Sequence, residues 1–83
     1  MNAIARHLLP DTARTEQGRL AIGGCDVHDL SRKFGTPLFV YDESHLRARC
    51  REAVTAFGSD AVIYATKAFL CTAMAQLAHE EGL

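Results

Sequence analysis

Residues 61–68 have the sequence AVIYATKA, and this stretch decides the expected fold. Its first five residues are apolar or aromatic and two of them are β-branched, which is typical of a strand buried on both faces of a parallel sheet. Lys67 follows at the end of this strand, just before a helical pattern begins. The carboxyl ends of parallel strands are where α/β proteins bind ligands, so the position of Lys67 predicts a functional site.

The chemistry expected of Lys67 depends on its surroundings. Low-dielectric walls would disfavour the charged ammonium and make the amine available as a nucleophile, which is the setting of a Schiff-base lysine. The alternative is that Lys67 extends its aliphatic stem and places its ammonium in water, as lysines usually do. Position alone favours this second interpretation.

Composition excludes several classes of protein. The chain has 83 residues, 48% hydrophobic and 23% charged, which is ordinary for a small globular domain. A formal net charge of −1 gives no basic surface for nucleic acid, and no apolar run approaches the ~20 residues that span a bilayer. Arg6 and His7 interrupt the N-terminal segment, so a secretory signal is not expected.

The cysteines and histidines carry no recognisable site. Cys25, Cys50 and Cys71 are odd in number and contain no C-x-x-C spacing, which favours a reducing compartment and predicts a cytoplasmic location. The four histidines are scattered without ligand spacing, so no metal site is predicted.

Periodicity and turn residues predict an alternation of strands and helices. In the predicted order, the chain begins with a loose arm over 1–18, which contains a helical turn near 4–9, and continues with a strand over 19–22 and a turn at 23–24. A helix capped by Asp26 and ended by Gly35 comes next, followed by a strand over 37–41. A helix then runs from Asp42 or Ser44 to Phe57, a strand covers 61–67, and a last helix covers about 70–81 with Gly82 as its cap. The last four elements form a βαβα run, which predicts a parallel sheet with a right-handed crossover.

Two strands that are apolar on both faces need more cover than this chain offers. The strands over 37–41 and 61–67 cannot be buried by the helices available, and parallel strands of this kind occur almost only in larger sheets or barrels. We therefore expect the sequence to be a piece of a longer α/β protein, marginally stable or prone to aggregation by itself.

Several motifs together resemble one family of enzymes. GTPLFVYDE at 35–43, LRARCRE at 46–52 and YATKA at 64–68, followed by FLC and a terminal EEGL, are similar to the beginning of the fold-type III PLP-dependent decarboxylases, and within them to the diaminopimelate decarboxylases. The resemblance covers residues 20–83. Many members of this family have Asn where Phe69 stands here, which removes an expected polar contact but leaves the equivalence of Lys67 intact.

The resemblance implies a fold and a chemistry. Residues 36–83 would be the first βαβα portion of a TIM-type (β/α)8 barrel of the alanine racemase kind, and residues 1–35 an arm that contributes to a β-domain. Lys67 would be the catalytic residue and would carry pyridoxal 5′-phosphate as a Schiff base, while Tyr64 and Ala65 would line the pocket. The reaction implied is decarboxylation of meso-2,6-diaminopimelate to L-lysine, by a homodimer that acts on this small amino acid.

The resemblance also places most of the active site elsewhere. Four groups of the family's active site would lie beyond Leu83: the phosphate-binding glycines, the partner of the pyridine nitrogen, the substrate-binding arginines and the partner subunit's catalytic cysteine. These 83 residues alone are therefore expected to be inactive. Two other interpretations remain open: another fold-type III enzyme, such as an ornithine- or arginine-type decarboxylase or a small PLP-homeostasis protein, and a non-catalytic α/β interaction module.

Overall fold

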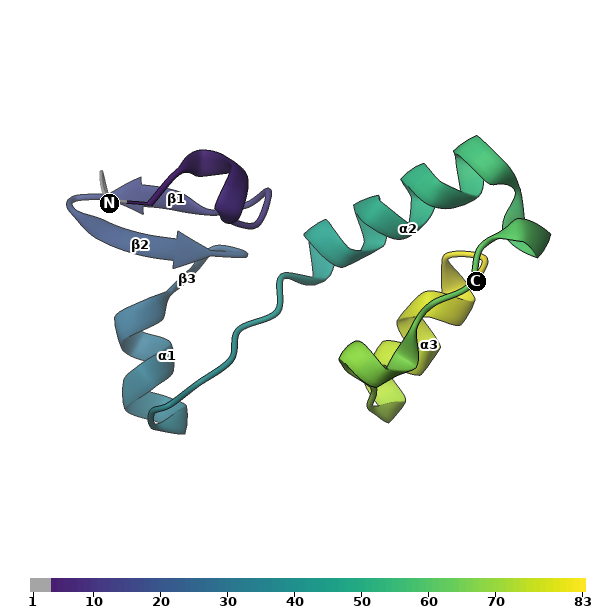
Figure 1. The fold of residues 1–83 in the computed structure, drawn as a ribbon. Helices are drawn as coiled ribbons and strands as arrows, with labels where there is room; N and C mark the ends of the chain where they lie inside the picture. Colours follow the sequence, from purple (N-terminus) through teal and green to yellow (C-terminus); the bar gives the residue numbers. More distant parts are fainter. Residues whose placement is uncertain (1–3) are drawn as a thin grey trace. The chain divides into compact units, whose positions relative to one another are not determined.

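The computed structural model describes residues 4–83 and has a small α/β fold, with one three-stranded antiparallel sheet and three α-helices (Figure 1). It divides into two compact units, the first ending at His45 and the second spanning Leu46–Leu83. The elements, in chain order, are η1 (Arg6–Leu8), β1 (Arg14–Glu16), β2 (Arg19–Ile22), β3 (Cys25–Asp26), α1 (Val27–Phe34), α2 (Glu43–Phe57), η2 (Ser59–Ala61), η3 (Thr66–Ala68) and α3 (Thr72–Glu80).

The sheet of the first unit is an antiparallel meander in the order β1-β2-β3. Thr15 pairs with Leu20 in its first ladder, and Ile22 pairs with Cys25 in its second. Gln17 and Gly18 connect β1 to β2 with φ values of 52° and 75°, the pair of positive angles that a tight two-residue hairpin turn requires. The predicted strand over 19–22 is confirmed, but the sequence analysis missed both of its neighbours.

Helix α1 has the two ends that its sequence predicts. The Asp26 carboxylate accepts a hydrogen bond of 2.7 Å from the backbone N–H of His28 and so caps the first turn. At the other end, the Gly35 N–H donates to the Ser31 carbonyl at 2.8 Å, and Gly35 has a φ of 82°. That angle suits a residue without a Cβ and stops the helix.

The two predicted parallel strands are wrong for this chain. Residues 37–41 are not paired with any strand. Ala61 is the last residue of η2, residues 62–65 form an unpaired segment, and η3 begins at Thr66. A strand needs a neighbour to satisfy its backbone groups, and the sheet described in residues 4–83 contains only β1, β2 and β3. As a result Phe39 is 88% exposed and Ile63 is 92% exposed. The barrel, and the domain boundary predicted after residue 35, stay predictions about a longer protein.

Residues of α2 and α3 enclose the apolar cluster of the second unit. Cys50, Met74, Leu77 and Ala78 are its buried members, and Leu46, Tyr64, Phe69 and Leu83 pack against them. Leu46 and Cys50 lie one turn apart on α2, as do Met74 and Ala78 on α3. The Leu83 N–H donates to the Ala78 carbonyl at 2.9 Å, which closes the C-terminus of α3 in a Schellman motif around Gly82.

Ion pairs join the same two helices at their polar edge. Arg47 contacts Glu81 at 2.8 Å and Glu80 at 2.9 Å, and Arg51 contacts Glu81 at 2.7 Å. Hydrogen bonds from Arg47 and Arg51 hold the pKa of Glu81 below its ordinary value. Local sequence patterns do not reveal these pairs, because their members lie 30 or more positions apart in the chain.

Candidate functional site

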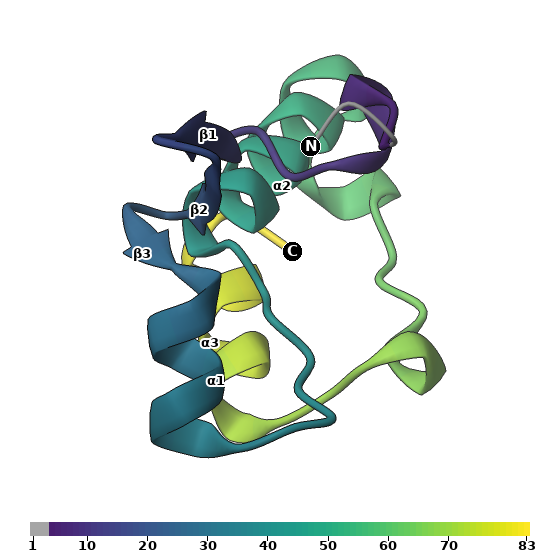
Figure 2. The same cartoon turned by 90° about the vertical axis from the view of Figure 1, so that its left-hand side faces the viewer.

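Lys67 lies in the middle of η3, a single turn between α2 and α3. The Ala68 N–H donates to the Ala65 carbonyl at 3.1 Å and closes this turn, and Lys67 itself is exposed. In Figure 2 the turn interrupts the extended connection that leads to α3. The low-dielectric walls expected around Lys67 are therefore absent from the described residues, because the strand that would have carried it has no partner.

Tyr64 and Phe69 anchor the two ends of this turn. Both side chains are partly buried against the cluster of Cys50, Met74 and Leu77. The Tyr64 hydroxyl also donates a hydrogen bond to the Phe69 carbonyl, across the residues that carry Lys67. Tyr64 thus contacts the apolar cluster of the second unit, while Ala65 is exposed. The predicted role of these two residues in lining a pocket stays a prediction.

The Lys67 turn meets one requirement of an aldehyde cofactor. Condensation with an aldehyde needs a primary amine that the reagent can reach, and an exposed lysine on a short turn offers it. The sequence contains one other lysine, Lys33, whose ammonium lies 5.3 Å from the centre of the Phe34 ring. Lys33 is exposed as well, so accessibility by itself does not distinguish the two amines.

Within residues 4–83 no three His, Cys, Asp or Glu side chains come close enough together to hold a metal ion. No helix in the same range is both long and apolar enough to cross a bilayer.

The first unit contains a pocket that the sequence analysis did not predict. Its volume is about 510 Å³, and it lies between α1, the end of β2 and the extended segment over 37–41. Apolar side chains line most of it, among them Ile22, Leu30, Phe34, Leu38 and Val40. The apolar run over 37–41, which follows a helix, is the sequence feature that could have indicated this pocket. It was interpreted as a strand, but it forms one wall of the pocket.

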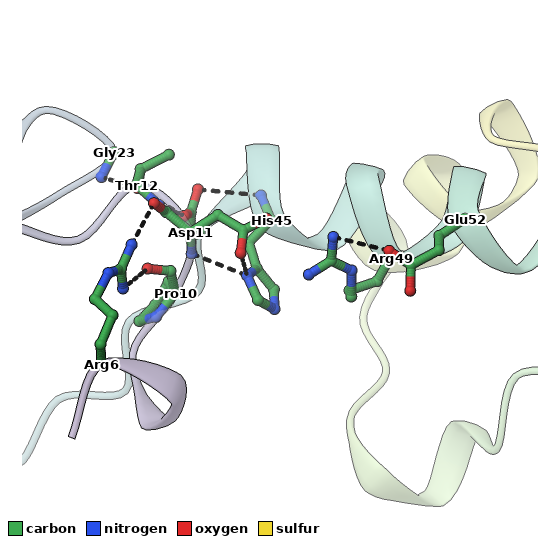
Figure 3. Close-up of polar contacts among 9 residues, drawn as sticks. Arg6, Pro10, Asp11, Thr12, Gly23, His45, Arg49 and Glu52 are labelled. Carbon is green, nitrogen blue, oxygen red and sulfur yellow. Dashed lines mark hydrogen bonds and ion pairs between the residues drawn. The ribbon is translucent and has the colours of Figure 1, made fainter.

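Asp42 is one of the residues that line this pocket, and it joins three segments of the first unit. It is the buried charged residue of the described chain, with an exposed fraction of 6%. Thr12 donates to its carboxylate from the hydroxyl at 2.6 Å and from the backbone at 3.2 Å. The Gly23 N–H donates in turn to the Thr12 hydroxyl at 2.7 Å, as Figure 3 shows. The carboxylate therefore links the N-terminal arm and the β2–β3 turn to the start of α2.

A contact between Asp11 and His45 lies next to the contact between Thr12 and Asp42 and joins the same two segments. The Asp11 N–H donates to Nδ1 of His45 at 3.0 Å, and the Asp11 carboxylate lies 3.2 Å from the same atom (Figure 3). Arg6 donates to the carbonyls of Pro10 and Asp11 at 2.9 and 2.8 Å, which fixes the arm before it reaches Thr12. These contacts give Asp42 a structural role in the first unit.

The stability of the first unit should depend on the ionisation of Asp42. Burial raises the pKa of Asp42, but hydrogen bonds from Thr12, His45 and Ser44 together outweigh it and hold the pKa below its ordinary value. A lowered folded pKa stabilises the fold above the ordinary range of aspartate, near pH 4, and this contribution disappears as the pH falls through the folded pKa. We expect Asp42→Asn to reduce the free energy of unfolding by about 1.5–3 kcal/mol at neutral pH.

Urea unfolding at pH 7 and at decreasing pH would measure this effect. The variant should also lose stability less steeply in acid than the unsubstituted chain, because it lacks the group that titrates. Asp60→Asn, at an exposed aspartate of η2, is the matched control and should leave stability nearly unchanged. Equal losses in the two variants would contradict the role of Asp42.

Comparisons with known proteins identify the relatives of this chain. No protein-family model matches it. Diaminopimelate decarboxylase of Mycobacterium tuberculosis is 49% identical over 83 residues, which cover 93% of this chain and 19% of that enzyme. The enzyme of Corynebacterium efficiens is 46% identical over 84 residues (99% of this chain, 18% of the enzyme), and that of Bacillus methanolicus is 50% identical over 76 residues (87% and 18%).

These matches confirm the family predicted from the motifs at 35–43, 46–52 and 64–68. The chain spans about a fifth of the length of the curated relatives that it matches. Identity of this level over nearly all of the 83 residues shows that the chain is homologous to the diaminopimelate decarboxylases.

Proposed function

We propose that this chain contributes the cofactor-binding lysine, Lys67, of a PLP-dependent enzyme that decarboxylates meso-2,6-diaminopimelate to L-lysine. The observation that carries the proposal is the match with the C. efficiens enzyme, which covers 99% of the chain and therefore includes Lys67 and the YATKA motif around it. The accessible amine on a tethered turn is compatible with this role.

Lys67 has two tasks in this proposal. Its Nζ atom would hold pyridoxal phosphate through the aldehyde carbon of the cofactor. When bound, the cofactor would supply the electron sink that lets a carboxyl group depart as carbon dioxide. A free Nζ atom at this position would also be close enough to move a proton at the reacting carbon.

The remaining parts of the proposal follow from the family. The substrate is a small amino acid, the enzyme is a cytoplasmic homodimer, and the fold that surrounds Lys67 is the (β/α)8 barrel. In that barrel the extended segments over 37–41 and 62–65 would gain the neighbours that they lack here, which would bury Phe39 and Ile63, and η3 would follow the second of them. The three relatives named above are diaminopimelate decarboxylases, which favours this substrate over ornithine or arginine.

A chimeric enzyme provides the test of Lys67. In this chimera, residues 1–83 of the present chain replace the matching segment of the M. tuberculosis relative, at 49% identity. After incubation with pyridoxal phosphate and reduction with borohydride, peptide mapping should find the cofactor on Lys67. Lys33 is the internal control and should carry little label, because it lies on α1 and outside the YATKA motif.

The same experiment separates the alternative interpretations. A non-catalytic interaction module predicts no preference for Lys67 over Lys33. Turnover of ornithine or arginine by the labelled chimera, in preference to diaminopimelate, would reassign the substrate while keeping the role of Lys67.

A further inference from the structure

Tyr64 closes a loop around the proposed cofactor-binding lysine. Its hydroxyl donates to the Phe69 carbonyl, and inside that loop the Ala68 N–H donates to the Ala65 carbonyl at 3.1 Å. Lys67 lies inside both loops. The residues on the inner hydrogen bond belong to η3 and its cap, so the backbone that carries the amine is constrained from both sides.

The loop is also fixed to the rest of the second unit. The rings of Tyr64 and Phe69 pack against Met74, Leu77 and the other buried residues of the apolar cluster. Between these two anchors Lys67 is exposed. The turn therefore presents an accessible amine from a backbone whose ends are held by packing and by a side-chain hydrogen bond.

We infer that Tyr64 is a positioning residue for Lys67: its hydroxyl, through the Phe69 carbonyl, holds the turn that presents the amine. The inference rests on the proposed function of Lys67 and extends it. A lysine held on a fixed turn gives up less freedom when it binds an aldehyde than one on a mobile loop, so binding is tighter. In this role Tyr64 acts on Lys67 through the backbone of the turn.

Removing only the hydroxyl isolates this effect. Tyr64→Phe keeps the ring that packs on the apolar cluster, so the helices should remain folded, which far-UV circular dichroism would check. Tyr41→Phe is the matched control, since Tyr41 is the other tyrosine of the chain and belongs to the first unit. A hydrogen bond of this kind contributes enough free energy for roughly a two- to tenfold change in an equilibrium.

The first measurement needs no cofactor. In the 83-residue chain, amide hydrogen exchange at Ala68 should become roughly two- to tenfold faster in Tyr64→Phe, because the turn opens more often when its outer closure is lost. Exchange at Ala68 should stay the same in Tyr41→Phe. Unchanged exchange in Tyr64→Phe would overturn the inference by itself, whatever Lys67 binds.

The second measurement follows the amine. In the chimera, Tyr64→Phe should raise by roughly two- to tenfold the pyridoxal phosphate concentration needed to label half of Lys67, with labelling of Lys33 unaffected. Half-labelling at an unchanged concentration would overturn the role toward the cofactor. An unsubstituted chimera with no label on Lys67 would overturn the proposed function instead, and the exchange experiment tells the two failures apart.

Discussion

Replacing Lys67 by alanine in the chimera is expected to reduce diaminopimelate decarboxylation by at least ~10²-fold, and by up to ~10⁴-fold, the range that a single positioned acid–base group contributes. The loss should be large because the substitution removes two functions at once, the nitrogen that holds the cofactor and the amine that moves a proton. Initial rates of lysine formation at saturating pyridoxal phosphate would measure it, together with the loss of borohydride-stable label.

Two controls make this prediction specific. Lys33→Ala in the same chimera should leave the rate unchanged, since Lys33 lies on α1 against Phe34. The 83-residue chain alone, supplied with cofactor and substrate, should form no lysine, because it spans about a fifth of its relatives. Full activity of Lys67→Ala would refute the assignment of this lysine.

Shortening Leu77 to alanine is expected to destabilise the second unit by about 2–4 kcal/mol, the usual effect of truncating a buried leucine. Leu77 is 7% exposed and belongs to the buried cluster with Cys50, Met74 and Ala78. A chain of 83 residues has a free energy of unfolding of only about 4–12 kcal/mol, so the substitution removes a large part of it. Urea unfolding should show a lower midpoint with little change in slope.

Leu70→Ala is the matched control for this prediction. Leu70 is 54% exposed in the connection before α3, so its truncation creates no cavity and should change stability by less than about 0.5 kcal/mol. If Leu77→Ala were as stable as Leu70→Ala, the apolar cluster would not be what holds α2 and α3 together.

Local signals in the sequence predicted the ends of helices well. Asp26 and Gly35 delimit α1 as expected, because capping depends on the few residues next to each terminus. Helix α2 ends at Phe57 as predicted, and Gly82 lies at the end of α3 with a positive φ.

Elements that depend on distant partners were predicted less well. The sequence analysis left 1–18 as a loose arm, yet Arg14–Glu16 pairs with β2 through a Gln17-Gly18 turn that carries only one weak signal, a single glycine. The buried role of Asp42 was also missed. Asp42 caps α2 as predicted, since the His45 N–H donates to its carboxylate at 3.4 Å, but its shortest contact is with the Thr12 hydroxyl, 30 positions earlier in the chain.

The sequence by itself determined the helices, their caps and the family to which the chain is related. Helices and caps depend on residues that are neighbours in the chain, and the family is recognised from sequence motifs. Only the tertiary structure decided whether the apolar runs over 37–41 and 61–67 become strands, whether Arg47 and Arg51 face solvent or Glu81, and how Lys67 is presented. The physical reason is that a strand, an ion pair or a buried amine exists only where a second segment supplies the missing partner.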